Sequence, residues 1–101
     1  MDKLAQIRAF VRVAERASFS AVARDLQVTQ SAVSRAISAL ESNLGTRLVS
    51  RSTRSVSLTD AGRGYYERCR QILSDLDAAD ASVGDSNSGA MGTLSIAAPV
   101  P

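Results

Sequence analysis

Four stretches of the chain carry the apolar spacing or the capping residues that are typical of helices. In the first of them, apolar side chains recur every three or four positions and most charged ones fall on the other side. The predicted helices cover residues 4–17, 21–26, 30–44 and 60–83. Residues suited to the ends of these helices are Asp2, Ser18 or Ser20, Thr29 and Thr59 as N-caps, and Gly45 as the stop of the third helix.

Between the third and fourth predicted helices the pattern changes to short alternating runs. Leu48-Val49 and residues 56–58 are predicted as two strands around a basic loop. The short second helix, a turn at Gln27-Val28 and the longer third helix form a helix-turn-helix, although this turn lacks the motif's common glycine. The predicted fold is therefore mainly α: a winged helix-turn-helix with three helices and a two-stranded wing, followed by a long dimerisation helix.

Serine is frequent on the outer face of the third predicted helix. The predicted buried stripe of this helix consists of Val33, Ile37, Leu40 and Leu44. The opposite face collects Ser31, Ser34, Arg35, Ser38 and Ser42. Serine is a poor helix former, so a merely solvated helix would carry Glu, Lys or Gln here. Small hydroxyl side chains keep the face thin enough for the major groove of DNA, which is about 12 Å wide. The alternative is a surface helix with accidental serines.

Three side chains around this helix have chemistry suited to DNA. The amide of Gln30, in the first turn, can address adenine, and the guanidinium of Arg35 can bind guanine or a phosphate. Ser20, at the start of the second predicted helix, can donate to a phosphate. The serines of the third helix can bond base edges or phosphates.

The predicted wing brings further cationic and hydroxyl side chains. Arg51, Thr53 and Arg54 are expected at the hairpin tip, where they can reach phosphates or a neighbouring minor groove. The alternative is a hairpin loop that only adds solubility.

The fourth predicted helix carries a narrow apolar seam with alternating spacings of four and three residues. Its members are Tyr65, Cys69, Ile72, Leu76, Ala79 and Val83. Such a seam is typical of a coiled coil, so we expect a homodimer through this helix. The alternative is that the helix docks on the first helix of its own chain. Cys69 is expected to be a small buried side chain rather than a redox sensor, and Gly62 and Gly64 to allow close approach at a helix crossing.

Charge and composition limit the possible functions. Residues 1–58 hold nine basic and four acidic side chains, a balance of +5, whereas residues 59–101 hold three basic and six acidic ones, a balance of −3. The basic part suggests an anionic partner. With no histidine and a single cysteine, neither a zinc site of the usual kind nor a histidine general base is expected. No long apolar run or signal-like start is present, so we expect a cytoplasmic protein without a membrane segment.

The run from Phe19 to Glu41, followed by Leu44-Gly45, Leu48, Arg51 and residues 58–62, resembles the N-terminal DNA-binding region of LysR-type transcriptional regulators. The resemblance covers about residues 3–84. It implies that positions matching Gln30, Ser31, Ser34 and Arg35 contact DNA, together with the wing. Many members carry proline where this chain has Ser31, so the apolar contact with a thymine methyl group is not carried over there and a hydroxyl contact becomes possible.

The resemblance also implies a domain organisation and a set of partners. Residues 1–58 would form the DNA-binding domain and residues 59–84 the linker helix through which the protein dimerises. Residues 85–101 would form a flexible hinge and the first strand of a truncated effector-binding domain. The implied partners are double-stranded DNA with an interrupted inverted repeat and a second copy of the chain, with a tetramer open for the full-length protein. A small-molecule effector would bind only through the missing C-terminal domain, and no cofactor or metal is expected.

Two other classes of function remain as rivals. A winged-helix module that binds a protein through its fourth helix would show no DNA binding at low salt. An enzyme is disfavoured because the chain has no paired-carboxylate site, phosphate-binding glycine motif or metal ligand set.

Overall fold

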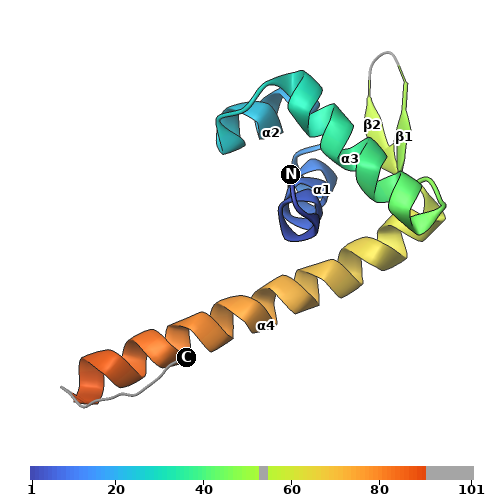
Figure 1. Cartoon of the computed structure of the whole chain (residues 1–101). Helices are drawn as coiled ribbons and strands as arrows, with labels where there is room; N and C mark the ends of the chain where they lie inside the picture. Colours follow the sequence, from blue (N-terminus) through green and yellow to red (C-terminus); the bar gives the residue numbers. More distant parts are fainter. Residues whose placement is uncertain (53–54, 91–101) are drawn as a thin grey trace. The chain divides into compact units, whose positions relative to one another are not determined.

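The computed structural model describes residues 1–52 and 55–90, although the side chains of residues 85–90 lie outside that description. The elements in chain order are α1 (Lys3–Arg16), α2 (Phe19–Leu26), α3 (Gln30–Leu44), β1 (Val49–Arg51), β2 (Val56–Leu58) and α4 (Asp60–Ala90) (Figure 1). The chain divides within α4 into two units, of which the first is Met1–Arg70 and the second begins at Gln71. The first unit contains the three predicted helices and the predicted two-stranded wing, so the predicted fold class is confirmed.

Side chains cap the N-termini of all four helices as the sequence predicts. The oxygens of Asp2, Ser18, Thr29 and Thr59 accept the first free backbone N–H groups at 2.8–3.1 Å. Since Ser18 rather than Ser20 caps α2, this helix begins at Phe19, two residues earlier than predicted. Each cap satisfies a backbone donor that the helix itself leaves unpaired, which sets where the helix starts.

The turn between α2 and α3 forms without glycine. Gln27 has a φ of +58° in the left-handed region, and its N–H donates to the carbonyls of Ala23 and Arg24. The N–H of Val28 also donates to the Ala23 carbonyl, at 3.0 Å. A left-handed non-glycine residue costs roughly 1–2 kcal/mol, which these capping bonds and the packing of the two helices offset. The missing glycine therefore does not prevent the helix-turn-helix.

The core of the first unit lies among α1, α2, α3, the start of the wing and the first turns of α4. Its largest fully buried side chains are Phe10, Val13, Val22, Val33, Ile37, Leu40, Leu48, Val49 and Cys69. Three members of the predicted α3 stripe are thus confirmed, but the prediction for Leu44 is wrong because its side chain is 37% exposed. Leu44 is the last residue of α3, at the rim of the core, and Ala36 and Glu41 are buried instead.

The wing is an antiparallel pair of three-residue strands. Val49 pairs with Leu58 and Arg51 with Val56, and the Ser52 N–H closes the ladder by donating to the Ser55 carbonyl at 2.9 Å. Val49 is completely buried, so β1 is anchored in the core on one side. Residues 53 and 54 at the tip lie outside the described residues.

Only one of the two glycines predicted to allow close approach does so. A Cβ on Gly62 would overlap the backbone carbonyl of Leu48, so the first turn of α4 can lie against the start of the wing only with glycine there. The close approach is therefore to the wing and not, as predicted, at a helix crossing. Around Gly64, by contrast, a Cβ would meet no atom within 4 Å. The prediction for Gly64 is therefore wrong.

Helix α4 is longer than its sequence pattern indicates. We expected it to end near Val83 and a flexible linker to follow at residues 84–92, but the helix continues to Ala90. Glycine, serine and asparagine each disfavour a helix by only about 1 kcal/mol or less, and extending an existing helix is easier than starting one. The predicted strand at residues 93–98 lies outside the described residues. No helix in the described part of the chain is long and apolar enough to cross a membrane.

The two glycines give a matched test of the contact between α4 and the wing. We expect Gly62→Ala to lower the free energy of unfolding by about 2 kcal/mol or more, because the added Cβ must push the Leu48 carbonyl away. Gly64→Ala should raise it by about 1 kcal/mol, since alanine is the better helix former and the site is open. Urea denaturation followed by circular dichroism measures both changes, and equal effects would contradict the close approach at Gly62.

Candidate nucleic-acid interface

The outer face of α3 is polar and has few partners within the molecule. Its exposed polar side chains are Gln30, Ser31, Arg35, Ser38 and Ser42. Within residues 1–52 and 55–90, none of these side chains makes a hydrogen bond or an ion pair. An amide, three hydroxyls and a guanidinium therefore keep all their donors and acceptors available on one face of one helix.

Some arginines of the first unit form ion pairs with acidic side chains, whereas Arg35 does not within the described residues. Arg12 of α1 and Arg16 at its end both pair with Asp25 of α2, at 3.7 and 3.4 Å, so they help to hold these two helices together. Arg35 has no acidic partner in the part of the chain that the structure describes, so its full positive charge is available to an anionic ligand on the outer face of α3.

Arg51 lies elsewhere than predicted. It is the last residue of β1 rather than part of the hairpin tip, and its Nη1 donates to the Oγ of Ser34 on α3 at 2.9 Å. Its Cζ also lies 4.5 Å from the centre of the Phe19 ring on α2, a cation–π distance. One guanidinium thus connects the wing with both helices of the helix-turn-helix. Thr53 and Arg54, the other predicted wing contacts, lie outside the described residues.

Ser20 is exposed in the first turn of α2. Its hydroxyl lies 3.2 Å from that of Ser18, which caps the helix, and it has no other side-chain partner in the described structure. Its predicted contact with a phosphate remains a prediction.

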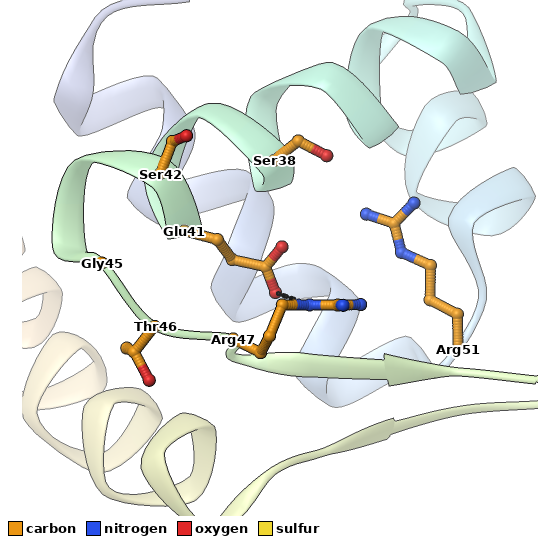
Figure 2. A pocket seen from close by; sticks show the side chains of 7 residues that line it. All are labelled: Ser38, Glu41, Ser42, Gly45, Thr46, Arg47 and Arg51. Carbon is orange, nitrogen blue, oxygen red and sulfur yellow. Dashed lines mark ion pairs between the residues drawn. The ribbon is translucent and has the colours of Figure 1, made fainter.

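A shallow pocket lies between the second half of α3 and the base of the wing (Figure 2). It is lined by Ser38, Glu41, Ser42, Gly45, Thr46, Arg47 and Arg51. Figure 2 shows the ion pair between Arg47 and Glu41 at its floor and Arg51 reaching from β1 toward α3. The pocket continues the polar face of α3 onto the wing, so the two elements offer one surface.

Glu41 is a structural residue of this surface that the sequence analysis missed. Its carboxylate is buried, and Oε2 accepts the N–H groups of Leu48 and Val49 at 2.8 and 3.1 Å. Arg47 Nε lies 3.6 Å from the same oxygen. The sequence did offer a signal for this role, because Glu41 stands four positions after Ile37, on the side of the helix that was expected to be apolar. Glu41 ties α3 to β1 and so determines where the wing begins relative to the helix.

The predicted dimer seam on α4 divides into two parts. Tyr65 packs on Phe10 of α1 with 5.7 Å between ring centres, and Cys69 is 1% exposed. Cys69 therefore belongs to the core of its own chain, and the half-buried Tyr65 packs against that core, so the prediction that Cys69 faces a second subunit needs correction. The alternative of docking on the first helix holds for the first turns of α4, where Tyr66 also donates to Glu15 at 2.9 Å.

Cys69 is a free, buried thiol, and the burial agrees with the prediction. Burial raises its pKa above the ordinary value, and a hydrogen bond with Tyr65 only partly opposes this. A thiol that stays protonated is a poor nucleophile.

Beyond Arg70, the predicted seam remains open. Ile72 and Val83 are 56% and 52% exposed, Ala79 is exposed and Leu76 is half-buried. Apolar side chains at successive spacings of four, three and four residues need cover, and a second helix with the same seam can provide it.

The geometry of the first unit defines a winged helix-turn-helix protein, and the comparisons with known proteins agree. Residues 4–63 match the family model described as "Bacterial regulatory helix-turn-helix protein, lysR family". Because this match covers more than half of the chain, the chain belongs to the LysR family.

Individual relatives cover most of this chain. It is 42% identical over 99 residues to an uncharacterised HTH-type transcriptional regulator of Haemophilus influenzae, and 41% identical over 96 residues to the HTH-type transcriptional activator AaeR of Escherichia coli. These matches span 98% and 95% of the chain but only 34% and 31% of the relatives. The chain therefore spans about a third of the length of these relatives.

Solved structures share the fold. The BenM DNA-binding domain, in a structure titled as its complex with catB site 1 DNA, superposes with a TM-score of 0.82 at 33% identity and covers 93% of this chain and all of that one. The CbnR DNA-binding domain, in a structure titled as a DNA complex, superposes with a TM-score of 0.72 at 37% identity and covers 89% of this chain and 99% of that one.

The contacts of Glu41 predict a large effect of its loss. Glu41→Ala should lower the free energy of unfolding by about 3 kcal/mol, because two buried backbone N–H groups lose a charged acceptor. Arg47→Ala, which removes the exposed ion-pair partner of the same carboxylate and a 3.4 Å hydrogen bond to the Val49 carbonyl, should cost less than about 1 kcal/mol. Chemical denaturation of both variants measures the difference, and similar losses would show that the backbone bonds to Glu41 contribute little.

Proposed function

We propose that this chain is the DNA-binding part of a dimeric transcription regulator and that it recognises specific double-stranded DNA through α3. The observation that carries the proposal is the outer face of α3, where five exposed polar side chains lack partners among the described residues. A folded protein normally lets such groups hydrogen-bond with water, but a face of small hydroxyls is also narrow enough to enter the major groove. The likeness to two DNA-binding domains from structures titled as DNA complexes supports the same use.

In this proposal the residues divide between reading bases and binding the backbone. Gln30, Ser31, Ser34, Arg35 and Ser38 of α3 contact base edges. Phosphate contacts come from Ser20 and from the wing, where Arg51, Thr53 and Arg54 were assigned from the sequence. The charge of +5 in residues 1–58 supplies affinity that does not depend on sequence.

The open part of the α4 seam supports a symmetric dimer. Ile72, Leu76, Ala79 and Val83 of two copies would pack against each other, so the dimer would carry two α3 helices. A twofold dimer reads two copies of the same half-site in opposite orientation, so we infer an interrupted inverted repeat as its DNA target.

Activation and repression both occur among the relatives. AaeR is named an activator, whereas a 35% identical relative from Pseudomonas aeruginosa is named a repressor, and this chain covers 95% of its own length in each match. We infer that the shared region recognises DNA without deciding the direction of regulation. The response to a small-molecule effector then belongs to the two thirds of the relatives that this chain does not cover.

We further propose that residues 1–58 are the DNA-binding domain and residues 59–84 the dimerisation segment. We also propose that the protein binds DNA in the cytoplasm and catalyses no reaction. The rival function, a winged-helix module that binds another protein, is tested by a gel shift on random DNA at low salt. Absence of any shifted complex would favour the rival.

Arg35 tests the base-reading face. Arg35→Ala should weaken binding to the preferred site by about 1–3 kcal/mol and flatten the preference at one base position, because the fork that reads this base is lost. Arg35→Lys is the matched control, since it keeps the charge and the salt dependence but loses the fork. Binding of both variants to a library of operator variants measures the effect. An unchanged preference at every position would exclude Arg35 from base reading.

Leu76 tests the dimer. Sedimentation should give a mass near twice 10.6 kDa for the unchanged chain, and Leu76→Glu should shift it toward monomer because a charge then enters the apolar seam. Ala78→Glu adds the same charge at an exposed position outside the seam and should leave the dimer intact. If the unchanged chain stays monomeric at high concentration, the proposed dimer contact through the α4 seam is refuted.

A further inference from the structure

We infer that Arg51 is a positioning residue that makes Ser34 a hydrogen-bond donor toward the DNA, so that Ser34 selects a base presenting an acceptor atom. This inference rests on the proposed function. It starts from one contact, in which Arg51 Nη1 on the wing donates to Ser34 Oγ on α3 at 2.9 Å. Ser34 is half-buried, whereas Ser31 and Ser38 on the same face are exposed.

The chemistry of the two groups determines where the hydroxyl hydrogen points. A guanidinium has five N–H donors and no acceptor, so the Ser34 hydroxyl must accept from it and cannot donate to it. Ser34 Oγ has no further partner within the described residues, including the carbonyls one turn earlier in α3. Its single hydrogen is therefore directed away from Arg51 and remains available to a ligand.

The positive charge beside Ser34 strengthens this bias. Next to a cation, the hydroxyl binds electron-rich acceptors more strongly and a second donor less strongly. In the major groove, the acceptors are purine N7, guanine O6 and thymine O4, and the donors are the amino groups of adenine and cytosine. Ser34 should therefore favour a base that presents an acceptor at its contact position and disfavour an amino group there.

Arg51 is held in place before any DNA arrives. Its backbone belongs to β1, paired with Val56, and its Cζ lies 4.5 Å from the Phe19 ring centre. Contacts with two other elements limit its rotamers, so Ser34 is oriented in the free protein and the ordering cost on binding falls. Ser31 and Ser38 have no such donor beside them in the described structure, so their hydroxyls can rotate to serve as donor or acceptor.

The test compares base preferences among variants of the whole chain. Ser34→Ala first identifies the base position that Ser34 contacts, as the position where its preference flattens. At this position we expect the unchanged protein to favour acceptor-bearing bases by about tenfold, the worth of one good hydrogen bond. Arg51→Met, which keeps an apolar stem beside Phe19 but removes the donor and the charge, should reduce this preference to about twofold or less.

A double variant separates positioning from a direct contact. If Arg51 acts through Ser34, the pair Ser34→Ala with Arg51→Met loses no more preference at this position than Ser34→Ala alone. Ser38→Ala with Arg51→Met is the matched control, and its effects on base preference should add. The preference at the other base positions should stay unchanged in Arg51→Met.

Three results would overturn the inference while DNA binding stands. If Arg51→Met lowers the salt dependence by about one ion and weakens all sequences alike, so that the preference at the Ser34 position is unchanged, Arg51 contacts only phosphate. If preference fades at every position and the free energy of unfolding falls, Arg51 only supports the fold. If Ser34→Ala flattens no position, Ser34 reads no base. Failure of the unchanged protein to prefer any sequence over random DNA would instead refute the proposed function itself.

Discussion

The arrangement of the first unit depends on one buried carboxylate. Glu41 stands on the inner row of α3 and accepts the N–H groups of Leu48 and Val49, so the chain that leaves α3 must enter the wing at a defined place. A buried charge is stable only where it is hydrogen-bonded, and these N–H groups would themselves be costly without an acceptor. The need to keep these hydrogen bonds to Glu41 therefore positions the wing beside the outer face of α3.

The wing is also joined to the helices from its other end. Arg51 contacts Ser34 and Phe19, so β1 is linked to α3 through Glu41 at its start and through Arg51 at its last residue. Gly62 adds a third close contact, because the first turn of α4 lies against the Leu48 carbonyl. The polar face of α3 is thus supported by elements that are distant from it in sequence.

Helix α4 serves two purposes along its length. Its first turns contribute Cys69 to the core of the first unit and pack Tyr65 against Phe10, whereas Ile72 and Val83 remain exposed further along. One apolar spacing continues through both parts, because the same heptad repeat can pack a helix against its own domain or against a second copy. Periodicity alone does not distinguish these two partners.

Most of the architecture followed from local sequence: the four N-caps, Gly45 as a helix stop, the paired strands and the polar face of α3 are properties of neighbouring residues. The local pattern also predicted that α4 ends at Val83 and that Arg51 lies at the hairpin tip, and both predictions were wrong. The helix extends further, to Ala90, and Arg51 pairs with Val56 in the wing. Three features could be recognised only in the tertiary structure. They are the hydrogen bonds of Glu41 to the wing, the hydrogen bond from Arg51 to Ser34, and the difference between the surroundings of Gly62 and Gly64. Each depends on atoms from distant segments meeting within a few ångströms, and no spacing along the chain encodes that distance.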